Sequence, residues 1–276
     1  MKKVFVAYAD EKMKYSLQRI GRQARRLDIF DEIILYTPND LPQYAKDSTL
    51  MQYSYGGGYW LWKPVIIYET LQKYEDGTVV CYVDAGCTLS QGVEWYLFFE
   101  LMKQYTGLCF KYPDFMQSWE KFGSSSTKIK HWTKKEALLE LDNFVGSSAY
   151  QECNKVMGGV LFFKGKHNSF LTDWLNISLN MPNIIIDPKG VEMDNQYAFF
   201  AQHKHDQPVI TALAFKYRTE VLILPELFEN PTRRTAILAS RIRAKNLWCF
   251  LQLRLKTFIR VCVGDVLVEK LKKIYK

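Results

Sequence analysis

The strongest constraint on the fold is a strand, a helix and a second strand in direct succession at the start of the chain. Lys3–Tyr8 (KVFVAY) and Asp31–Tyr36 (DEIILY) are apolar, β-branched runs typical of strands, and Glu11–Arg26 between them has helical character. This spacing favours a βαβ unit and therefore a parallel sheet. The first turn contains no Gly-x-Gly-x-x-Gly, so the dinucleotide-binding fingerprint is absent.

Residues 56–63 form the most distinctive short stretch of the chain. Its sequence, GGGYWLWK, places three glycines before Tyr59, Trp60, Trp62 and Lys63. Flat aromatic rings suit sugar and base binding as well as hydrophobic cores. For each tryptophan taken alone, a core anchor is the preferred interpretation, and Lys63 can extend its stem over the core to reach solvent.

A short helix and a buried strand follow this stretch. Pro64 suits the first turn of a helix, where a missing N–H costs little. Val79–Val83 is an apolar run typical of a buried strand, and it ends at Asp84. Open α/β sheets bind ligands at the carboxyl ends of their strands, so we expect Asp84 in a binding site. Lys63 and the helix start would add positive charge suited to a diphosphate.

Two glycines interrupt a later strand. Asn154–Lys164 is apolar enough to be a strand, and Gly158 and Gly159 lie inside it. Paired glycines at such a place indicate either the close approach of a ligand or another segment, or a β-bulge.

The sequence HKHDQ at residues 203–207 is the second candidate cluster. It holds two of the chain's four histidines and precedes Pro208 and an apolar helical run. Asp206 stands where a helix N-cap would, and capping alone would explain it. The histidines are also suited to a metal, a phosphate or a sugar hydroxyl.

Positive charge is concentrated near the C-terminus. The chain has 37 Lys and Arg against 29 Asp and Glu, and residues 232–276 hold 12 of the former and 2 of the latter. We therefore predict a main body at 1–231 and a basic helical tail at 232–276 that meets an anionic membrane surface, or else packs on the body as a helical pair. A charge concentrated outside the body argues against a nucleic-acid partner. We interpret four arginines of the first helix as solvated surface, with phosphate binding as the alternative: Arg19, Arg22, Arg25 and Arg26.

Compartment signals are few. The six cysteines form no Cys-x-x-Cys pair, which favours reduced thiols in a cytoplasmic protein. The N-terminal apolar run is too short for a signal peptide, and no run of about 18 uncharged apolar residues predicts a membrane-spanning helix. We expect a cytoplasmic protein held peripherally at the inner face of the cytoplasmic membrane.

Three motifs together resemble a known family. GGGYWLWKP, then VVCYVDAGC, then HKHDQ before an apolar helix is similar to bacterial GT-A superfamily glycosyltransferases that assemble surface polysaccharides, such as O-antigen, capsule or lipooligosaccharide. The resemblance extends from about Lys3 to Leu224. It implies an α/β fold with a Rossmann-type, mixed and mainly parallel sheet flanked by helices, to which the basic helical tail is an extension.

The resemblance also implies roles for individual residues. Asp206 takes the place of the catalytic base of inverting members. A UDP-sugar donor, galactose in pyranose or furanose form, would contact Ala7, Tyr8, Tyr59, Trp60, Trp62, Lys63, Asp84, Ala85 and Gly86. The acceptor, a glycan or lipid-linked glycan, would contact Trp132, Gly158, Gly159, His203, His205 and Gln207.

The metal site of such enzymes is incomplete here. Asp84-Ala85-Gly86 matches the usual Asp-x-Asp except that Gly86 replaces the second carboxylate. Asp84 alone is a thin ligand set for Mg²⁺ or Mn²⁺. Without the metal, Lys63, the helix N-terminus and the histidines must offset the charge of the leaving diphosphate.

Three other functions compete with glycosyl transfer. The missing carboxylate also fits a non-catalytic nucleotide-sugar-binding or scaffold protein of the same fold. A sugar nucleotidyltransferase should carry a Gly-rich loop after the first strand, where this chain has Ala-Tyr-Ala-Asp-Glu. The basic tail alone would also fit a membrane adaptor.

Overall fold

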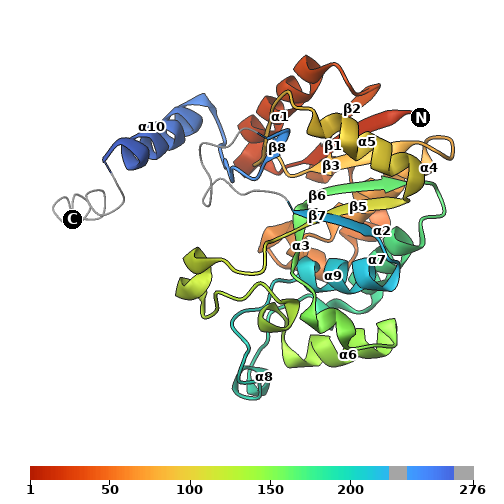
Figure 1. The fold of residues 1–276 in the computed structure, drawn as a ribbon, viewed down its shortest axis with the longest axis vertical. Helices are drawn as coiled ribbons and strands as arrows, with labels where there is room; N and C mark the ends of the chain where they lie inside the picture. The colour runs from red at the N-terminus through yellow and green to blue at the C-terminus, as the bar shows by residue number, and fades with distance from the viewer. Residues whose placement is uncertain (224–234, 264–276) are drawn as a thin grey trace.

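Six strands form one mixed sheet in the order β2-β1-β3-β6-β5-β7 (Figure 1). The structure is a computed structural model that describes residues 1–223 and 235–263, the side chains of 256–263 excepted. Its strands are β1 (Lys3–Tyr8), β2 (Glu32–Tyr36), β3 (Val79–Val83), β5 (Gly107–Lys111), β6 (Val156–Lys164) and β7 (Glu220–Ile223). Within this sheet only β6 runs opposite to the others, pairing antiparallel with β3 and β5. The carboxyl ends of β1 and β3 therefore share one edge.

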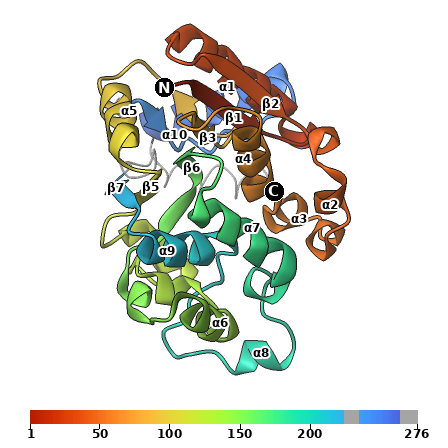
Figure 2. The same cartoon turned by 90° about the vertical axis from the view of Figure 1, so that its right-hand side faces the viewer.

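Helices cover both faces of the sheet. α1 (Lys14–Leu27) and α5 (Glu94–Gln104) lie on one face, and α4 (Trp62–Gln72), α7 (Ser169–Asn180) and α9 (Asp206–Lys216) on the other. Figure 2 shows α4, α7 and α9 following one another along the sheet. The shorter or more peripheral helices are α2 (Gln43–Lys46), α3 (Gly56–Tyr59), α6 (Lys135–Val145) and α8 (Val191–Asp194). Single 3₁₀ turns occur at Glu11–Met13, Pro38–Asp40, Thr49–Gln52, Gln117–Phe122, Ile129–Trp132, Ala149–Glu152 and Pro182–Ile184.

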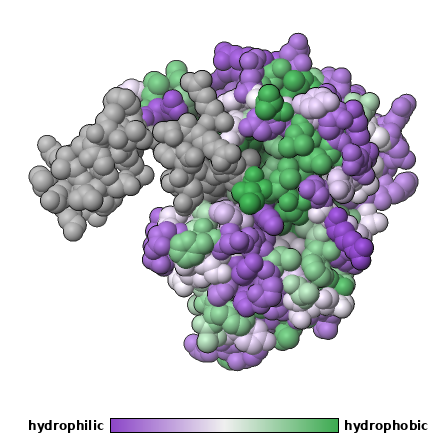
Figure 3. All heavy atoms as spheres, in the orientation of Figure 1, coloured by the Kyte–Doolittle hydropathy of each residue, from purple (hydrophilic) through white to green (hydrophobic). Residues whose placement is uncertain are grey.

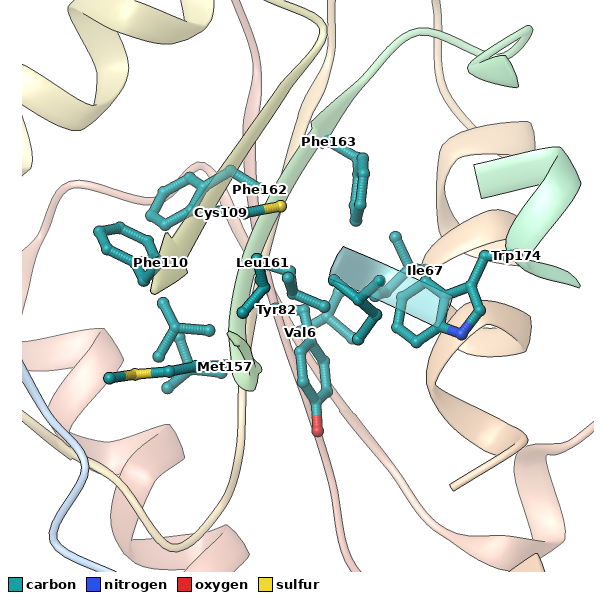
Figure 4. Packing of buried hydrophobic residues seen from close by; sticks show 14 of the residues in the cluster. Val6, Ile67, Tyr82, Cys109, Phe110, Met157, Leu161, Phe162, Phe163 and Trp174 are labelled. Atoms are coloured by element: carbon teal, nitrogen blue, oxygen red, sulfur yellow. The ribbon is translucent and has the colours of Figure 1, made fainter. Parts of the chain in front are cut away.

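The hydrophobic core consists of two layers, one on each face of the sheet, and β6 contributes side chains to both. Successive strand residues point to opposite faces, so Phe162 packs on Phe98 of α5 while Phe163 packs on Phe170 of α7, with ring centroids 5.7 and 5.0 Å apart. Figure 4 shows Phe162 and Phe163 on opposite sides of the strand, with Trp174 on the Phe163 side. Burying a side chain of this size contributes about 1.5–3 kcal/mol. Both faces of β6 are covered, which explains why its sequence is a continuous apolar run and does not alternate between apolar and polar residues.

The prediction of an α/β fold with a mixed, mainly parallel sheet flanked by helices is confirmed. The strand predicted at 79–83 has those bounds. The helix expected to begin at Pro64 begins two residues earlier, at Trp62, so Pro64 is its third residue and still lies within the first turn.

Residues 235–246, which we call the return segment, run back onto the body. Within it β8 (Ile237–Leu238) pairs antiparallel with β4 (Thr88–Leu89). The predicted boundary at residues 231 and 232 lies outside the described part of the chain. α10 (Leu247–Val263) follows the return segment and extends away from the sheet (Figure 1), touching α1 through the Tyr15 and Phe250 rings, 5.4 Å apart. The predicted helical extension corresponds to α10 as far as it is described.

Candidate active site

A pocket of about 750 Å³ opens at the carboxyl edge of β1 and β3. Its lining combines the ends of both strands, the start of β6, the N-terminus of α9, the glycine-aromatic stretch and the return segment. A sheet edge of this kind suits ligand binding, because several loops converge there while the strands hold them rigidly. The pocket therefore lies at the sheet edge where the sequence analysis predicts the candidate residues.

A buried ammonium group joins the two candidate carboxylates. Lys63 Nζ lies 2.7 Å from Asp206 Oδ2 and 3.9 Å from Asp84 Oδ1, and it donates to the Gly158 carbonyl at 2.9 Å. Burial lowers the pKa of Lys63, but the charges of Asp206 and Asp84 outweigh burial and raise the pKa above its usual value. Lys63 therefore stays charged and pairs with Asp206, which lies 143 positions later in the chain.

Asp84 is fixed from three sides. Its backbone N–H donates to the Gly159 carbonyl at 2.8 Å, which continues the β3–β6 ladder past the last strand residue. The Tyr82 hydroxyl donates to Oδ1. Asp84 remains partly exposed and lines the pocket, so it is the more accessible of the two carboxylates.

The paired glycines allow these carboxylates to approach the strand. A Cβ on Gly158 would lie 2.6 Å from Asp206 Oδ2, and a Cβ on Gly159 would lie 2.9 Å from Asp84 Oδ2. Both distances are too short for any side chain. The close approach of another segment is therefore the reason for the glycines, although the β5–β6 register also shifts between Cys109 and Lys111.

Asp206 is the first residue of α9 and not its N-cap. The N-cap residue is His205, whose φ of 56° is left-handed and whose side chain makes no capping bond. The prediction that Asp206 occupies the N-cap is wrong, because its carboxylate turns toward Lys63. Asp206 Oδ1 has no hydrogen-bond partner among the described residues, which leaves it available to a ligand.

His203 serves the scaffold behind the pocket. Its Nδ1 accepts the Lys134 backbone N–H at 3.2 Å, so Nε2 carries the proton and donates to the Ile184 and Ile185 carbonyls. Burial, and secondarily the neighbouring His205 and Lys134, lower the pKa of His203 well below its usual value. The ring is 1% exposed and is not part of the pocket lining.

His205 by contrast lines the pocket. Its ring stacks on Trp60, with centroids 5.3 Å apart and an interplanar angle of 27°, and its Nδ1 donates to the Ile185 carbonyl at 3.1 Å. Burial lowers the pKa of His205, with Asp187 opposing the shift. The neutral imidazole therefore presents Nε2 as a hydrogen-bond acceptor.

Stacked aromatic rings make a rigid wall. Tyr8 stacks on Trp62 with centroids 4.0 Å apart, and Trp62 Nε1 donates to the Gly56 carbonyl at 3.0 Å. Tyr59 and Trp60 have φ of 49° and 62°, a left-handed conformation that side chains with a Cβ rarely adopt. Such strain persists only where the surrounding structure enforces it, and it clusters at functional sites.

Gln207 carries a buried acceptor beside the pocket. Its Oε1 is closed to solvent and has no hydrogen-bond partner among the described residues. A buried unsatisfied amide oxygen costs about 1–3 kcal/mol. Gln207 follows Asp206 directly and is one of the residues that line the pocket.

Most predicted site residues come together in this pocket. Those lining it are Tyr8, Trp60, Trp62, Asp84, Ala85, Gly86, Trp132, Gly158, Gly159, His205, Asp206 and Gln207. Those lying behind the lining are Ala7, Tyr59, Lys63 and His203. Ala7, Tyr59, Lys63 and His203 can therefore affect a ligand only through a residue that lines the pocket.

Several cations near the pocket have positions that the sequence analysis did not predict. Arg19 is 7% exposed and donates to the Ala85 and Cys87 carbonyls, so its interpretation as solvated surface is wrong. Arg19 and the buried Ile20 lie only approximately on the same face of α1, and no sequence motif distinguishes Arg19 from the other arginines of this helix. Lys155 lines the pocket beneath Trp119, and Arg241 and Arg243 reach it from the return segment.

The described residues form no protein-only site for a divalent metal ion. They contain no cluster of three or more His, Cys, Asp or Glu side chains that could hold one. The two carboxylates at the edge already face the ammonium of Lys63. Gly86 contributes no ligand, and the return segment covers it, with its Ile242 N–H donating to the Gly86 carbonyl at 2.8 Å.

Comparisons with known proteins find similarity in structure only. No protein-family model and no curated protein sequence matches the chain. Among solved structures, a glycosyltransferase involved in the glycosylation of the major capsid of PBCV-1 has 7% identity over 86% of this chain and 93% of its own, with a TM-score of 0.47. Mouse xyloside xylosyltransferase 1 has 9% identity over 87% and 97%, with a TM-score of 0.43.

A third solved structure is a galactosyltransferase, LgtC, in complex with donor and acceptor sugar analogs. It has 11% identity, covers 85% of this chain and 86% of its own, and has a TM-score of 0.41. Because each of these TM-scores lies below 0.5, we base the function on the geometry of the site instead.

Proposed function

We propose that this protein is a glycosyltransferase that moves a hexose from a nucleoside diphosphate sugar to a hydroxyl group of a glycan. The observation that carries the proposal is the meeting of Asp84 and Asp206 around Lys63 in one aromatic-walled pocket. One carboxylate lies at the end of a strand and the other at the start of a helix, as the sequence motifs suggest. Glycosyl transfer needs a group to accept a proton and a rigid place for a sugar ring.

Asp206 is the proposed base of an inverting reaction. Its Oδ1 accepts the proton of the acceptor hydroxyl while that oxygen attacks the anomeric carbon. The bond from the anomeric carbon to the phosphate oxygen breaks, and the nucleoside diphosphate leaves with the bonding electrons. Lys63 fixes Oδ2 at 2.7 Å and thereby orients the carboxylate, so we assign Lys63 a positioning role.

Substrate contacts follow from the pocket lining. We assign the donor to the side formed by Tyr8, Trp60, Trp62 and Asp84, where stacked rings exclude water. We assign the acceptor to the side formed by Gln207, His205 and Trp132, where His205 Nε2 is available to accept a hydrogen bond from a hydroxyl group. The sequence motifs favour UDP-galactose, in pyranose or furanose form, and a surface glycan or lipid-linked glycan as the acceptor.

Membrane attachment through α10 is a further part of the proposal. Leu247, Trp248, Leu251 and Leu255 recur at helical spacing and are between 48% and 68% exposed. Figure 3 shows hydrophobic residues at the described start of this helix, beside the grey part of the chain. None of the described helices combines the length and hydrophobicity needed to cross a bilayer. We therefore assign α10 to the surface of an anionic membrane, on its cytoplasmic side.

A donor screen tests the proposed activity. The protein is incubated with a panel of nucleoside diphosphate sugars and glycan acceptors, and release of the nucleoside diphosphate and the anomeric configuration of the product are measured. Asp206→Asn should lower kcat by about 10²–10⁴-fold, because the proton acceptor is lost while the pocket keeps its shape. A retained anomeric configuration would end the role of Asp206 as base, and full activity of Asp84→Ala would end the assignment of the donor side.

A further inference from the structure

Three of the four arginines of α1 share one flank of the helix. Arg19 and Arg22 follow Tyr15 by four and seven positions, and a helix brings such positions to the same side. Arg26 continues this flank, four positions beyond Arg22. Arg25 lies further around the helix, so it is the one arginine of α1 that leaves the Tyr15 flank.

Helix α10 packs against this same flank of α1 (Figure 1). The rings of Tyr15 and Phe250 lie 5.4 Å apart, and the guanidinium of Arg22 lies 5.5 Å from the centre of the Tyr15 ring. Burial lowers the pKa of Arg19 to about 10, and the positive charges of Arg254 and Arg22 add to this lowering. Guanidinium groups from two helices therefore gather where α1 and α10 meet.

Arg254 connects this place to the apolar side of α10. It follows Phe250 by four positions and Leu251 by three, so on the helix surface it is a neighbour of both. Leu251 and Leu255 are 48% and 59% exposed and belong to the stripe that also contains Trp248. The basic residues and the exposed apolar stripe therefore form one continuous surface.

Arg22, Arg26 and Arg254, which we call the basic junction, are exposed. None of the ion pairs found within the described part of the chain involves them. Guanidinium groups match phosphate oxygens in pairs, and the long arginine stem lets the charge stay at the level of lipid headgroups. An anionic bilayer therefore suits both parts of this surface, with acyl chains for the leucines and phosphates for the arginines.

We propose that the basic junction binds the phosphate groups of anionic lipids while the apolar stripe of α10 enters the membrane interface. Because Arg22 and Arg26 belong to the body, the membrane then fixes the orientation of the body and does not merely tether it. Arg243 lines the pocket and α10 begins at Leu247, so the Cα atoms of these two residues are at most about 14 Å apart. The use of this orientation for a lipid-linked acceptor rests on the proposed function, but lipid binding can be measured without any substrate.

Co-sedimentation of the full chain with lipid vesicles tests the inference. We expect binding to vesicles of equal parts phosphatidylglycerol and phosphatidylcholine, and little binding to phosphatidylcholine alone. Arg22→Gln and Arg254→Gln should each weaken binding to the anionic vesicles about fivefold, and the double variant about 25-fold. Arg25→Gln removes the same charge from the other side of α1 and should weaken binding by less than about twofold, because the attraction falls off within a Debye length.

Two results would overturn the inference. Equal losses in Arg22→Gln and Arg25→Gln would show that net charge alone matters, and wild-type binding by the double variant would show that α10 binds without α1. Tighter binding of soluble polyglutamate than of anionic vesicles would assign the surface to an acidic protein partner and also overturn it.

The same measurements stand apart from the proposed activity. Arginine-dependent vesicle binding without turnover of any donor sugar supports the inference and removes the proposed function. Glycosyl transfer by a protein whose vesicle binding ignores Arg22 and Arg254 supports the function and overturns the inference.

Discussion

Lys63 shows how one buried cation organises the residues of this pocket. Its stem crosses the core from α4, and its ammonium reaches Asp206, Asp84 and the Gly158 carbonyl. An isolated buried charge would be strongly unfavourable, whereas a paired and hydrogen-bonded one is tolerated. The geometry of Asp206 therefore depends on a residue that does not itself line the pocket.

Gly158→Ala tests the close packing around this cation. Its Cβ would lie 2.6 Å from Asp206 Oδ2 and 3.0 Å from Lys63 Nζ, so the carboxylate must move. We expect kcat for glycosyl transfer to fall on the order of a hundredfold, since small misplacements of a catalytic group are costly. Gly146→Ala is the control: it lies at the end of α6 with nothing within 4 Å, so it should cost stability through its left-handed φ and leave kcat unchanged. Wild-type kcat in Gly158→Ala would contradict the role of Asp206.

His203 predicts how stability depends on pH. Its pKa in the folded state is lowered by burial, so the unfolded chain binds more protons as the pH falls below about 6.5. Folding free energy is then fully retained above that pH and declines as acid is added, because a protonated Nδ1 would face the Lys134 N–H. Urea unfolding between pH 5 and 7.5 (a range chosen to bracket about 6.5) should show a flatter profile for His203→Gln than for the wild type.

A histidine on the surface provides the comparison for this experiment. His167 is exposed, and His167→Gln should keep the wild-type slope. Equal slopes for His203→Gln and the wild type would mean that acid sensitivity comes from other groups.

At the scale of elements, the return segment links the two ends of the described chain. It adds β8 to β4, clamps Gly86 and binds Ser16 on α1. These contacts join residues far apart in sequence, 226 positions in the case of Ser16 and Ile242. The return segment therefore completes the pocket through contacts with distant parts of the chain.

Ser16→Ala tests this link. Removing the hydroxyl leaves the Ile242 carbonyl and the Ala244 N–H without their partner, which should cost about 1–3 kcal/mol. We expect faster proteolytic cleavage within residues 235–246 and weaker binding of UDP. Ser178→Ala, a buried serine on α7, is the control and should leave both unchanged. Unaltered proteolysis in Ser16→Ala would show that the other hydrogen bonds suffice to hold the segment.

At the scale of the whole molecule, basic charge near the C-terminus divides between two tasks. Arg241 and Arg243 belong to the pocket, whereas α10 continues outward with exposed apolar residues. A helix with such a face binds a lipid surface through its buried apolar area and through attraction to anionic headgroups. The proposed transfer to a lipid-linked acceptor would then occur near the membrane.

Trp248→Glu tests the membrane contact. Trp248 is 68% exposed, and a carboxylate there would remove apolar area and repel anionic lipid. We expect co-sedimentation with phosphatidylglycerol vesicles to fall at least tenfold while UDP binding stays intact. Leu97→Glu changes an exposed leucine on α5 in the same way and should leave vesicle binding unaltered. Equal losses in the two variants would argue for general hydrophobic adhesion and against a role of α10.

The sequence by itself determined four strands of the sheet, β1, β2, β3 and β6, and the edge of the sheet where the pocket lies. Apolar runs and turn residues act locally, so Val79–Val83 could be placed without knowing its neighbours. The same local logic placed Asp84 at the end of a buried strand. It also indicated that Gly158 and Gly159 make room for another segment, although it could not choose between that and a bulge.

Only the tertiary structure decided which side chains meet. The pairing of Lys63 with Asp206, the scaffold role of His203 and the burial of Arg19 depend on contacts between residues far apart in sequence. The Gly86 carbonyl also accepts a hydrogen bond from Ser240 in the return segment, more than 150 positions later. Periodicity and composition carry no information about such contacts. The contacts are determined by how the helices and strands pack, because packing brings together backbone groups and charges that are far apart in the sequence.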